Sequence, residues 1–150
     1  MAEYQYVVFK LGDDWYGGDI MHIREIIKPM EITRIPNNPS FIEGIIKLRG
    51  EIIPILDLKK RFKLGNYDVN NKSTRFIIAE VEGRPIGFIV DEVREVLRIE
   101  DKDIGPIPEV VAIGKEYIVG TAENNGRLVL LLDMTKILTV DEREVLAAIS

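Results

Sequence analysis

The chain has 150 residues, enough for a domain whose core is stable without disulfides, and it contains no cysteine. With 20 basic and 25 acidic residues its net charge is −5, which repels polyphosphate and argues against nucleic acid as a partner. The N-terminal region carries acidic residues, and no apolar run is long enough to cross a membrane. We therefore expect a cytoplasmic protein without direct membrane insertion.

The first half of the chain predicts a strand, a hairpin and a short helix. Residues Tyr4–Leu11 are rich in β-branched and aromatic side chains and are followed by a Gly/Asp turn, which predicts a strand. Ile45–Leu48 and Glu51–Leu56 flank Arg49-Gly50 and predict a hairpin. Asp57 follows the hairpin, where its carboxylate would accept hydrogen bonds from free backbone N–H groups and cap a short helix. The polar residues 63–74 then predict a surface loop.

The second half predicts the same series. Arg75–Val81 predicts a strand, and Tyr117–Ala122 and Arg127–Leu132 predict a hairpin around Asn125-Gly126, a pair that suits a type I′ turn. Asp133 follows that hairpin as Asp57 follows the first one.

A helix is expected at the C-terminus, over residues 139–150. Thr139 and Glu142 fit a capping box, and Val145, Leu146 and Ile149 share one helical face. We expect this helix to pack on a barrel.

The two series align as an internal duplication. Residues 6–28 align without a gap with residues 76–98, and residues 41–62 align with residues 117–138. Three positions of the first pair and six of the second are identical, and the apolar pattern and the turn glycines agree as well. The sequence thus predicts a mainly β fold with short helices. We expect one domain over residues 1–150, with a first barrel at 1–66 and a second at 73–138.

The sequence contains none of the common catalytic motifs that we looked for. The single histidine, His22, aligns with Glu92 of the second copy, and we interpret it as a residue tolerated at the end of an element. Walker, G-x-S-x-G and G-x-G-x-x-G motifs are absent, and zinc would lack both thiolates and a second histidine. We expect no catalytic residue, no metal and no cofactor.

The two hairpin turns differ at Arg49. Where the second copy has Asn125-Gly126, which tolerates positive φ, the first has Arg49-Gly50, and arginine would be strained in the same turn. Either a function retains Arg49, or the first hairpin uses another turn type without strain; geometry favours neither. Ile23 and Glu25 are repeated as valine and glutamate in the second copy, which on its own is also compatible with a scaffold role.

The residues 33–58, TRIPNNPSFIEGIIKLRGEIIPILDL, and their prelude FKLGDDWYGGDIMHIREII closely resemble the core signature of the CheW-like domain family of chemotaxis coupling proteins. The resemblance spans the chain from Tyr6 to the C-terminal helix. It implies two SH3-like five-stranded β-barrels that share a hydrophobic interface, in agreement with the duplication. Two positions depart from the family pattern: Lys47, where many members have asparagine, and Glu51, where an apolar or small residue is common.

The resemblance also implies a function. It is that of a non-enzymatic adaptor, a monomer when free, that links the cytoplasmic domain of chemoreceptors to the histidine kinase CheA and is recruited to membrane chemoreceptor arrays. The alternative from another class is a regulatory β-barrel that binds a small ligand between the two barrels. Which positions contact the receptor and which contact the kinase stays open. The protein-binding residues carried over from the motif are Ile23, Glu25, Gly44 and Arg49, with Leu48 and Phe76 added as apolar neighbours.

Overall fold

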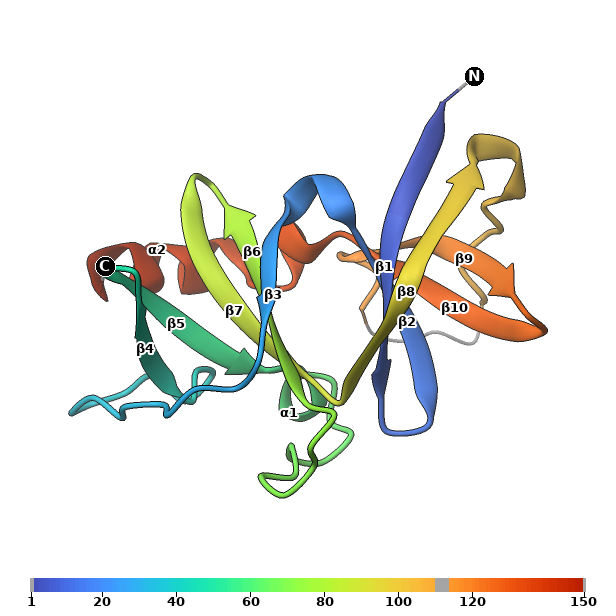
Figure 1. The fold of residues 1–150 in the computed structure, drawn as a ribbon. Helices are drawn as coiled ribbons and strands as arrows, with labels where there is room; N and C mark the ends of the chain where they lie inside the picture. Colours follow the sequence, from blue (N-terminus) through green and yellow to red (C-terminus); the bar gives the residue numbers. More distant parts are fainter. Residues whose placement is uncertain (1, 110–113, 150) are drawn as a thin grey trace.

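The computed structural model describes residues 2–109 and 114–149. Within them the chain forms two five-stranded sheets and a few short helices (Figure 1). The strands are β1 (Glu3–Leu11), β2 (Asp14–Asp19), β3 (Ile23–Ile27), β4 (Gly44–Leu48), β5 (Glu51–Asp57), β6 (Arg75–Val81), β7 (Arg84–Val90), β8 (Glu92–Glu100), β9 (Ile118–Asn124) and β10 (Arg127–Leu132). The helices are η1 (Ile20–His22), α1 (Leu58–Arg61), η2 (Asp101–Asp103), η3 (Met134–Lys136) and α2 (Val140–Ile149).

Each sheet curls into a small barrel, and the two barrels lie side by side. Barrel A has the strand order β8-β1-β2-β10-β9, and barrel B has the order β3-β6-β7-β5-β4. Exchanging every strand for its partner in the duplication converts one order into the other. In Figure 1 barrel A lies on the right and barrel B on the left. The predicted mainly β fold with two five-stranded barrels is confirmed, and the matching topology supports the duplication.

The predicted barrel boundaries, 1–66 and 73–138, are wrong because the two copies exchange strands. The hairpin β1–β2 joins β8, β9 and β10 of the second copy, and the hairpin β6–β7 joins β3, β4 and β5 of the first. The connections explain this exchange. A single residue, Asp91, separates β7 from β8, which is too short for a hairpin turn, so the chain runs directly from barrel B into barrel A. The short helix η1 carries it the other way between β2 and β3.

Three apolar clusters hold the molecule together, one inside each barrel and a larger one between them. Strand β6 takes part in two of these clusters. Its Phe76 and Ile78 lie in the barrel B cluster, whereas Ile77 and Ala79 lie in the cluster between the barrels. Side chains alternate across a strand, so the apolar run of β6 reflects two buried faces. The shared interface fixes the two barrels to each other.

The expected aspartate caps are present in both copies. The Asp57 carboxylate, 2 % exposed, accepts hydrogen bonds from the N–H groups of Lys59 at 3.0 Å and Lys60 at 3.4 Å, and from Tyr67 at 2.9 Å. Burial raises the pKa of Asp57, although these backbone hydrogen bonds oppose the shift. Asp133 accepts in the same way from the Thr135 N–H at 3.0 Å. Capping, rather than chemistry, accounts for both carboxylates.

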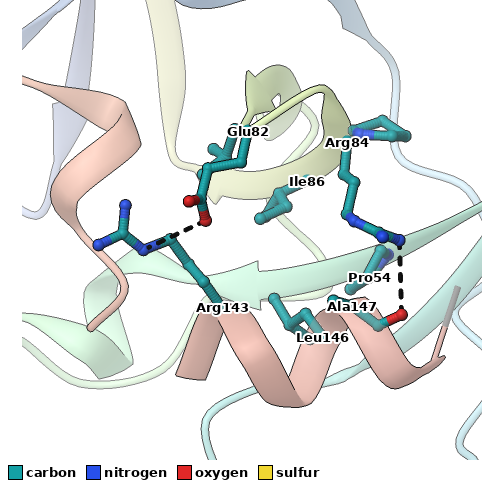
Figure 2. A pocket seen from close by; sticks show the side chains of 9 residues that line it. Pro54, Glu82, Arg84, Ile86, Arg143, Leu146 and Ala147 are labelled. Atoms are coloured by element: carbon teal, nitrogen blue, oxygen red, sulfur yellow. Dashed lines mark hydrogen bonds and ion pairs between the residues drawn. The ribbon is translucent and has the colours of Figure 1, made fainter. Parts of the chain in front are cut away.

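Helix α2 begins with the predicted capping box and packs on barrel B. The Thr139 N–H donates to Glu142 at 2.9 Å, and the Glu142 N–H donates to the Thr139 hydroxyl at 3.1 Å. Figure 2 shows Leu146 and Ala147 facing Pro54 and Ile86, with dashed contacts from Arg143 to Glu82 and from Arg84 to the Ala147 carbonyl.

The predicted apolar face of this helix needs one correction. Leu146 is 3 % exposed and packs on the barrel, whereas Val145 is 44 % exposed because the strip that contacts barrel B is narrower than expected. The side chain of Ile149 lies outside the described residues. The described part of the chain also contains no helix with the length and apolar character that crossing a membrane requires.

A paired arginine and glutamate tie α2 to α1. Arg61 donates to both carboxylate oxygens of Glu142, at 2.7 and 2.6 Å, and both side chains are largely buried. Burial alone would raise the pKa of Glu142, but the hydrogen bonds from Arg61 and Thr139 outweigh it and hold the pKa below its ordinary value of 4.5. A carboxyl group with a lowered folded-state pKa stabilises the fold above the unfolded-state value, and this contribution is lost as the pH falls through the folded-state pKa.

We therefore expect Glu142→Gln to lower the free energy of unfolding by about 1–2 kcal/mol near pH 7, because one oxygen that accepts from the charged guanidinium is lost. The difference between the parent and this variant should shrink as the pH drops below about 4.5. Urea unfolding at several pH values measures it. A difference that stays constant down to about pH 3 would contradict the assignment.

Candidate protein-binding site

The turn between β4 and β5 holds Arg49 in the left-handed region. Its φ is 49° and that of Gly50 is 83°, close to 53° and 76° at Asn125 and Gly126 of the equivalent turn. The question left open by the sequence is thus answered, because both hairpins use the same turn type and Arg49 carries the strain. Glu82 also has a φ of 52° in the turn between β6 and β7, so strain alone does not mark a functional residue.

The distinguishing feature of Arg49 is its ionic partner. Its guanidinium donates to the carboxylate of Glu25 on β3, and this contact joins the β4–β5 turn to the opposite edge strand of barrel B. The Arg49 side chain is 65 % exposed and that of Glu25 is 27 % exposed. The hydrogen bond to Glu25 raises the pKa of Arg49, whose guanidinium is charged at physiological pH in any case. The structure therefore brings together two residues of the motif that lie far apart in sequence.

A second ionic group lies beside this pair, and the sequence did not single it out. Arg24 of β3 donates to Glu51 at 2.9 Å and lies 3.7 Å from a carboxylate oxygen of Glu80 on β6. All three side chains are partly exposed or exposed. Two features of the sequence concern this group: Arg24 is repeated in the second copy, and Glu51 departs from the family pattern. This end of barrel B is thus a surface of paired opposite charges.

The predicted apolar residues lie closer to the core than expected. Ile23 is partly buried against the cluster between the barrels, and Leu48 is partly buried against the core of barrel B. The more exposed apolar side chains near the charges are those of Ile26, at 38 %, and Ile52, at 44 %. They lie on β3 and β5, within two residues of the charged positions of those strands. Ile23 and Leu48 stay predicted contact residues, and Ile26 and Ile52 are more exposed apolar side chains near the same charges.

Phe76 does not belong to this surface. It is 1 % exposed inside barrel B, where it pairs in register with Ile27 of β3. The prediction that Phe76 contacts a partner is corrected by this burial, because the ring has no accessible area to offer. Its place in the alternation of β6 directs it into the core.

Gly44 is also buried, and its role is one of close packing. Thr33 and Ile45 exchange backbone hydrogen bonds of 2.8 and 2.9 Å, which brings the segment before β4 against the strand. A side chain at Gly44 would overlap the Thr33 carbonyl oxygen and the Ile32 side chain. Gly44 begins β4 and Leu48 ends it, so the glycine lies about 13 Å along the strand from the Arg49 turn.

Arginine is enriched in protein–protein interfaces, and on barrel B the exposed Arg49 lies near two exposed isoleucines. The fold and this surface indicate a double β-barrel module with a candidate protein-binding face.

Comparison with known proteins identifies the family of this module. The family model described as a CheW-like domain matches residues 5–142. The chemotaxis protein CheW of Treponema pallidum is 36 % identical over 149 residues, which cover 97 % of this chain and 88 % of that protein. The CheW of Klebsiella aerogenes is 37 % identical over 141 residues, covering 92 % and 83 % respectively. The chain belongs to the CheW-like domain family.

A solved structure agrees with this assignment. The crystal structure of the scaffolding protein TtCheW from Thermoanaerobacter tengcongensis matches with a TM-score of 0.83 and 39 % sequence identity. The match covers 95 % of this chain and 92 % of that one. The double barrel is therefore similar both in sequence and in fold to a CheW scaffold.

We expect Gly44→Ala to lower the free energy of unfolding by about 1–3 kcal/mol, because the added methyl group must displace backbone at Thr33. Chemical denaturation measures the loss. Gly126→Ala is a useful control for the steric term, since no atom lies within 4 Å of a Cβ there and only the backbone conformation is strained. Equal losses in the two variants would show that close packing at Thr33 is not what Gly44 provides.

Proposed function

We propose that this protein is a non-enzymatic adaptor of bacterial chemotaxis, which couples the cytoplasmic domain of chemoreceptors to the histidine kinase CheA. Membership of the CheW-like family carries the proposal, together with a relative named as a chemotaxis protein and a similar structure described as a scaffolding protein. The protein acts in the cytoplasm as a monomer when free, and it is recruited to membrane receptor arrays by its partners.

The Glu25–Arg49 pair is the centre of one binding face. A guanidinium has five N–H donors, and Glu25 is the partner that occupies part of them. The rest of this exposed group is available to a carboxylate or a carbonyl of another protein. Glu25 on β3 fixes the side chain of Arg49, so little side-chain entropy is lost when a partner binds.

The two barrels present unequal faces. At the position of barrel A that corresponds to Glu25, Glu95 accepts a hydrogen bond of 3.0 Å from the neutral amide of Asn124. The exposed arginine of barrel B is replaced there by Asn125. Since the apolar interface fixes the barrels to each other, one rigid body can hold two different partners at a set distance. This arrangement supports an adaptor role.

His22 is the residue that could suggest catalysis, but its Nδ1 atom has no hydrogen-bond partner among the described residues. The Nδ1 atom of His22 lies 3.8 Å from Asp133, but that carboxylate accepts from the Thr135 hydroxyl at 2.6 Å and from its N–H at 3.0 Å. His22 ends η1, as expected of a residue tolerated at the end of an element. These contacts support a function without turnover.

The small-ligand alternative is not favoured. It requires space between the barrels, but the largest apolar cluster fills the interior of this junction, with Phe9, Phe88 and Leu132 at 1 % exposure or less. A pocket of about 140 Å³ lies at the edge of the cluster, beside Tyr117 and Leu130. The matched relatives and the scaffold structure support protein binding.

We expect Arg49→Asn to weaken the binding of CheA or of a soluble receptor fragment by about 1–3 kcal/mol, because an exposed arginine at the centre of the face is lost. The free energy of unfolding should stay nearly constant. The loss of an exposed ion pair costs less than about 1 kcal/mol, and asparagine relieves strain at positive φ. Calorimetric titration with each partner, and kinase activity in a reconstituted mixture, measure the effect.

Lys63→Asn is the matched control, since it also replaces a basic residue by asparagine at a positive φ, here 60°, and Lys63 follows α1 at the other end of β5. It should bind both partners as the parent does. If Arg49→Asn binds both partners normally, the face is misplaced. If the parent protein binds neither CheA nor the receptor fragment, the proposed function is wrong.

A further inference from the structure

The open end of barrel A carries an unusual cluster of three cations around one aromatic ring. Trp15, the single tryptophan of the chain, is the second residue of β2, close to the turn after β1. The Lys10 Nζ atom lies 5.8 Å from the centre of its ring, the Arg94 Cζ atom 5.5 Å and the Arg127 Cζ atom 4.7 Å. The three cations come from β1, β8 and β10. We name Trp15, Lys10, Arg94 and Arg127 the tryptophan cluster.

The positive charge of this cluster is only partly balanced. Arg94 pairs with Glu92 at 3.0 Å, and the nearby Glu95 accepts from Asn124. Among the described residues, neither Lys10 nor Arg127 has a carboxylate within ion-pair distance. Cations close to one another repel, and the face of an indole ring offsets only about 1–2 kcal/mol of such repulsion. On a chain of net charge −5, the cluster is a local positive surface.

The equivalent place on barrel B has the opposite character. The duplication aligns Arg94 with Arg24, but it aligns Lys10 with Glu80 and Arg127 with Glu51. In barrel B these two glutamates neutralise the arginine, at 3.7 and 2.9 Å. The same position of the fold therefore holds a neutralised arginine in one barrel and three cations in the other. The two barrels share one strand order, so this difference in charge comes from the side chains and not from the fold.

The shape of the cluster indicates the kind of partner. One side of Trp15 packs against the core of barrel A, and the side chain is partly exposed. Arg94 and Arg127 are exposed, so the cluster presents an open surface to solvent. Several carboxylates spaced along a chain can each reach a different cation, and arginine binds carboxylates in a bidentate manner.

We propose that the tryptophan cluster is a docking surface for an acidic segment of a partner protein. Carboxylates of the segment replace the missing counterions of Lys10 and Arg127, and the partly exposed indole ring packs against the stems of the acidic side chains. Removal of these charges from water is compensated by the pairing of opposite charges, so binding depends on ionic strength. The proposal concerns this surface alone and stands whether or not the partner is CheA or a receptor.

The position of Trp15 gives a direct test, because the fluorescence of the protein's single tryptophan reports on the cluster. The full chain is titrated at low salt with a synthetic peptide of six glutamates, and binding is followed by tryptophan emission and by calorimetry. We expect saturable binding that weakens at least tenfold between about 50 and 200 mM salt, as several ion pairs are screened. The Lys10→Gln/Arg127→Gln double variant should bind at least tenfold more weakly than the parent.

The control variant Lys28→Gln/Lys72→Gln removes the same charge at two exposed lysines elsewhere and should bind like the parent. Circular dichroism establishes that both variants are folded. Equal binding of the peptide by both double variants would overturn the proposal, as would the absence of a calorimetric and a fluorescence response in the parent. If inorganic phosphate binds as tightly as the peptide, the surface binds simple anions and the proposal of an acidic protein segment is refuted. Self-association that the peptide does not reduce would assign the surface to a second copy instead.

Discussion

The apolar packing between the two barrels is the constraint on which the rest of the structure depends. Strands such as β6 bury one face in their own barrel and the other in the junction. A strand with two buried faces has no room for a polar side chain that contacts a partner. Exposed charges are therefore found mainly at strand ends, in turns and on edge strands, as Arg49 and Arg127 are. The position of the binding surfaces follows from the way the core is built.

The duplication supplies two copies of one framework, and the side chains at the barrel ends make them different. Arg24 and Arg94 occupy equivalent positions, yet one is neutralised by two glutamates and the other stands beside Lys10 and a tryptophan. Such changes cost little stability, because exposed charges contribute little to folding. The framework can therefore keep its packing while each end acquires its own electrostatic character.

Much of the local structure could be predicted from the sequence, and the pairing of strands could not. The strand at Arg75–Val81, the hairpins and the caps at Asp57 and Thr139 depend on neighbouring residues, and the structure contains all of them. Which strand pairs with which depends on contacts between distant residues, and periodicity carries no information about them. The repeat suggested that each copy folds by itself, whereas the single residue Asp91 between β7 and β8 forces the exchange.

The candidate binding site on barrel B could also be predicted only in part from the sequence. The family motif gave Glu25 and Arg49, but their direct contact requires the closed barrel to bring β3 next to the β4–β5 turn. Phe76 was misassigned because a strand with apolar residues on both faces gives no sign of which face, if either, meets solvent. The repeat of Arg24 and the unusual Glu51 were visible in the sequence, but their pairing was not, because an ion pair between two strands depends on contacts between distant residues.

The exchange of strands between the copies also bears on the origin of the molecule. One copy alone contributes two strands to one barrel and three to the other, so by itself it completes neither sheet. An ancestor of half this length would have closed its barrels only by trading segments with a twin, as domain-swapped dimers do. Joining the genes end to end would have made that partnership permanent, and only then could its two members diverge.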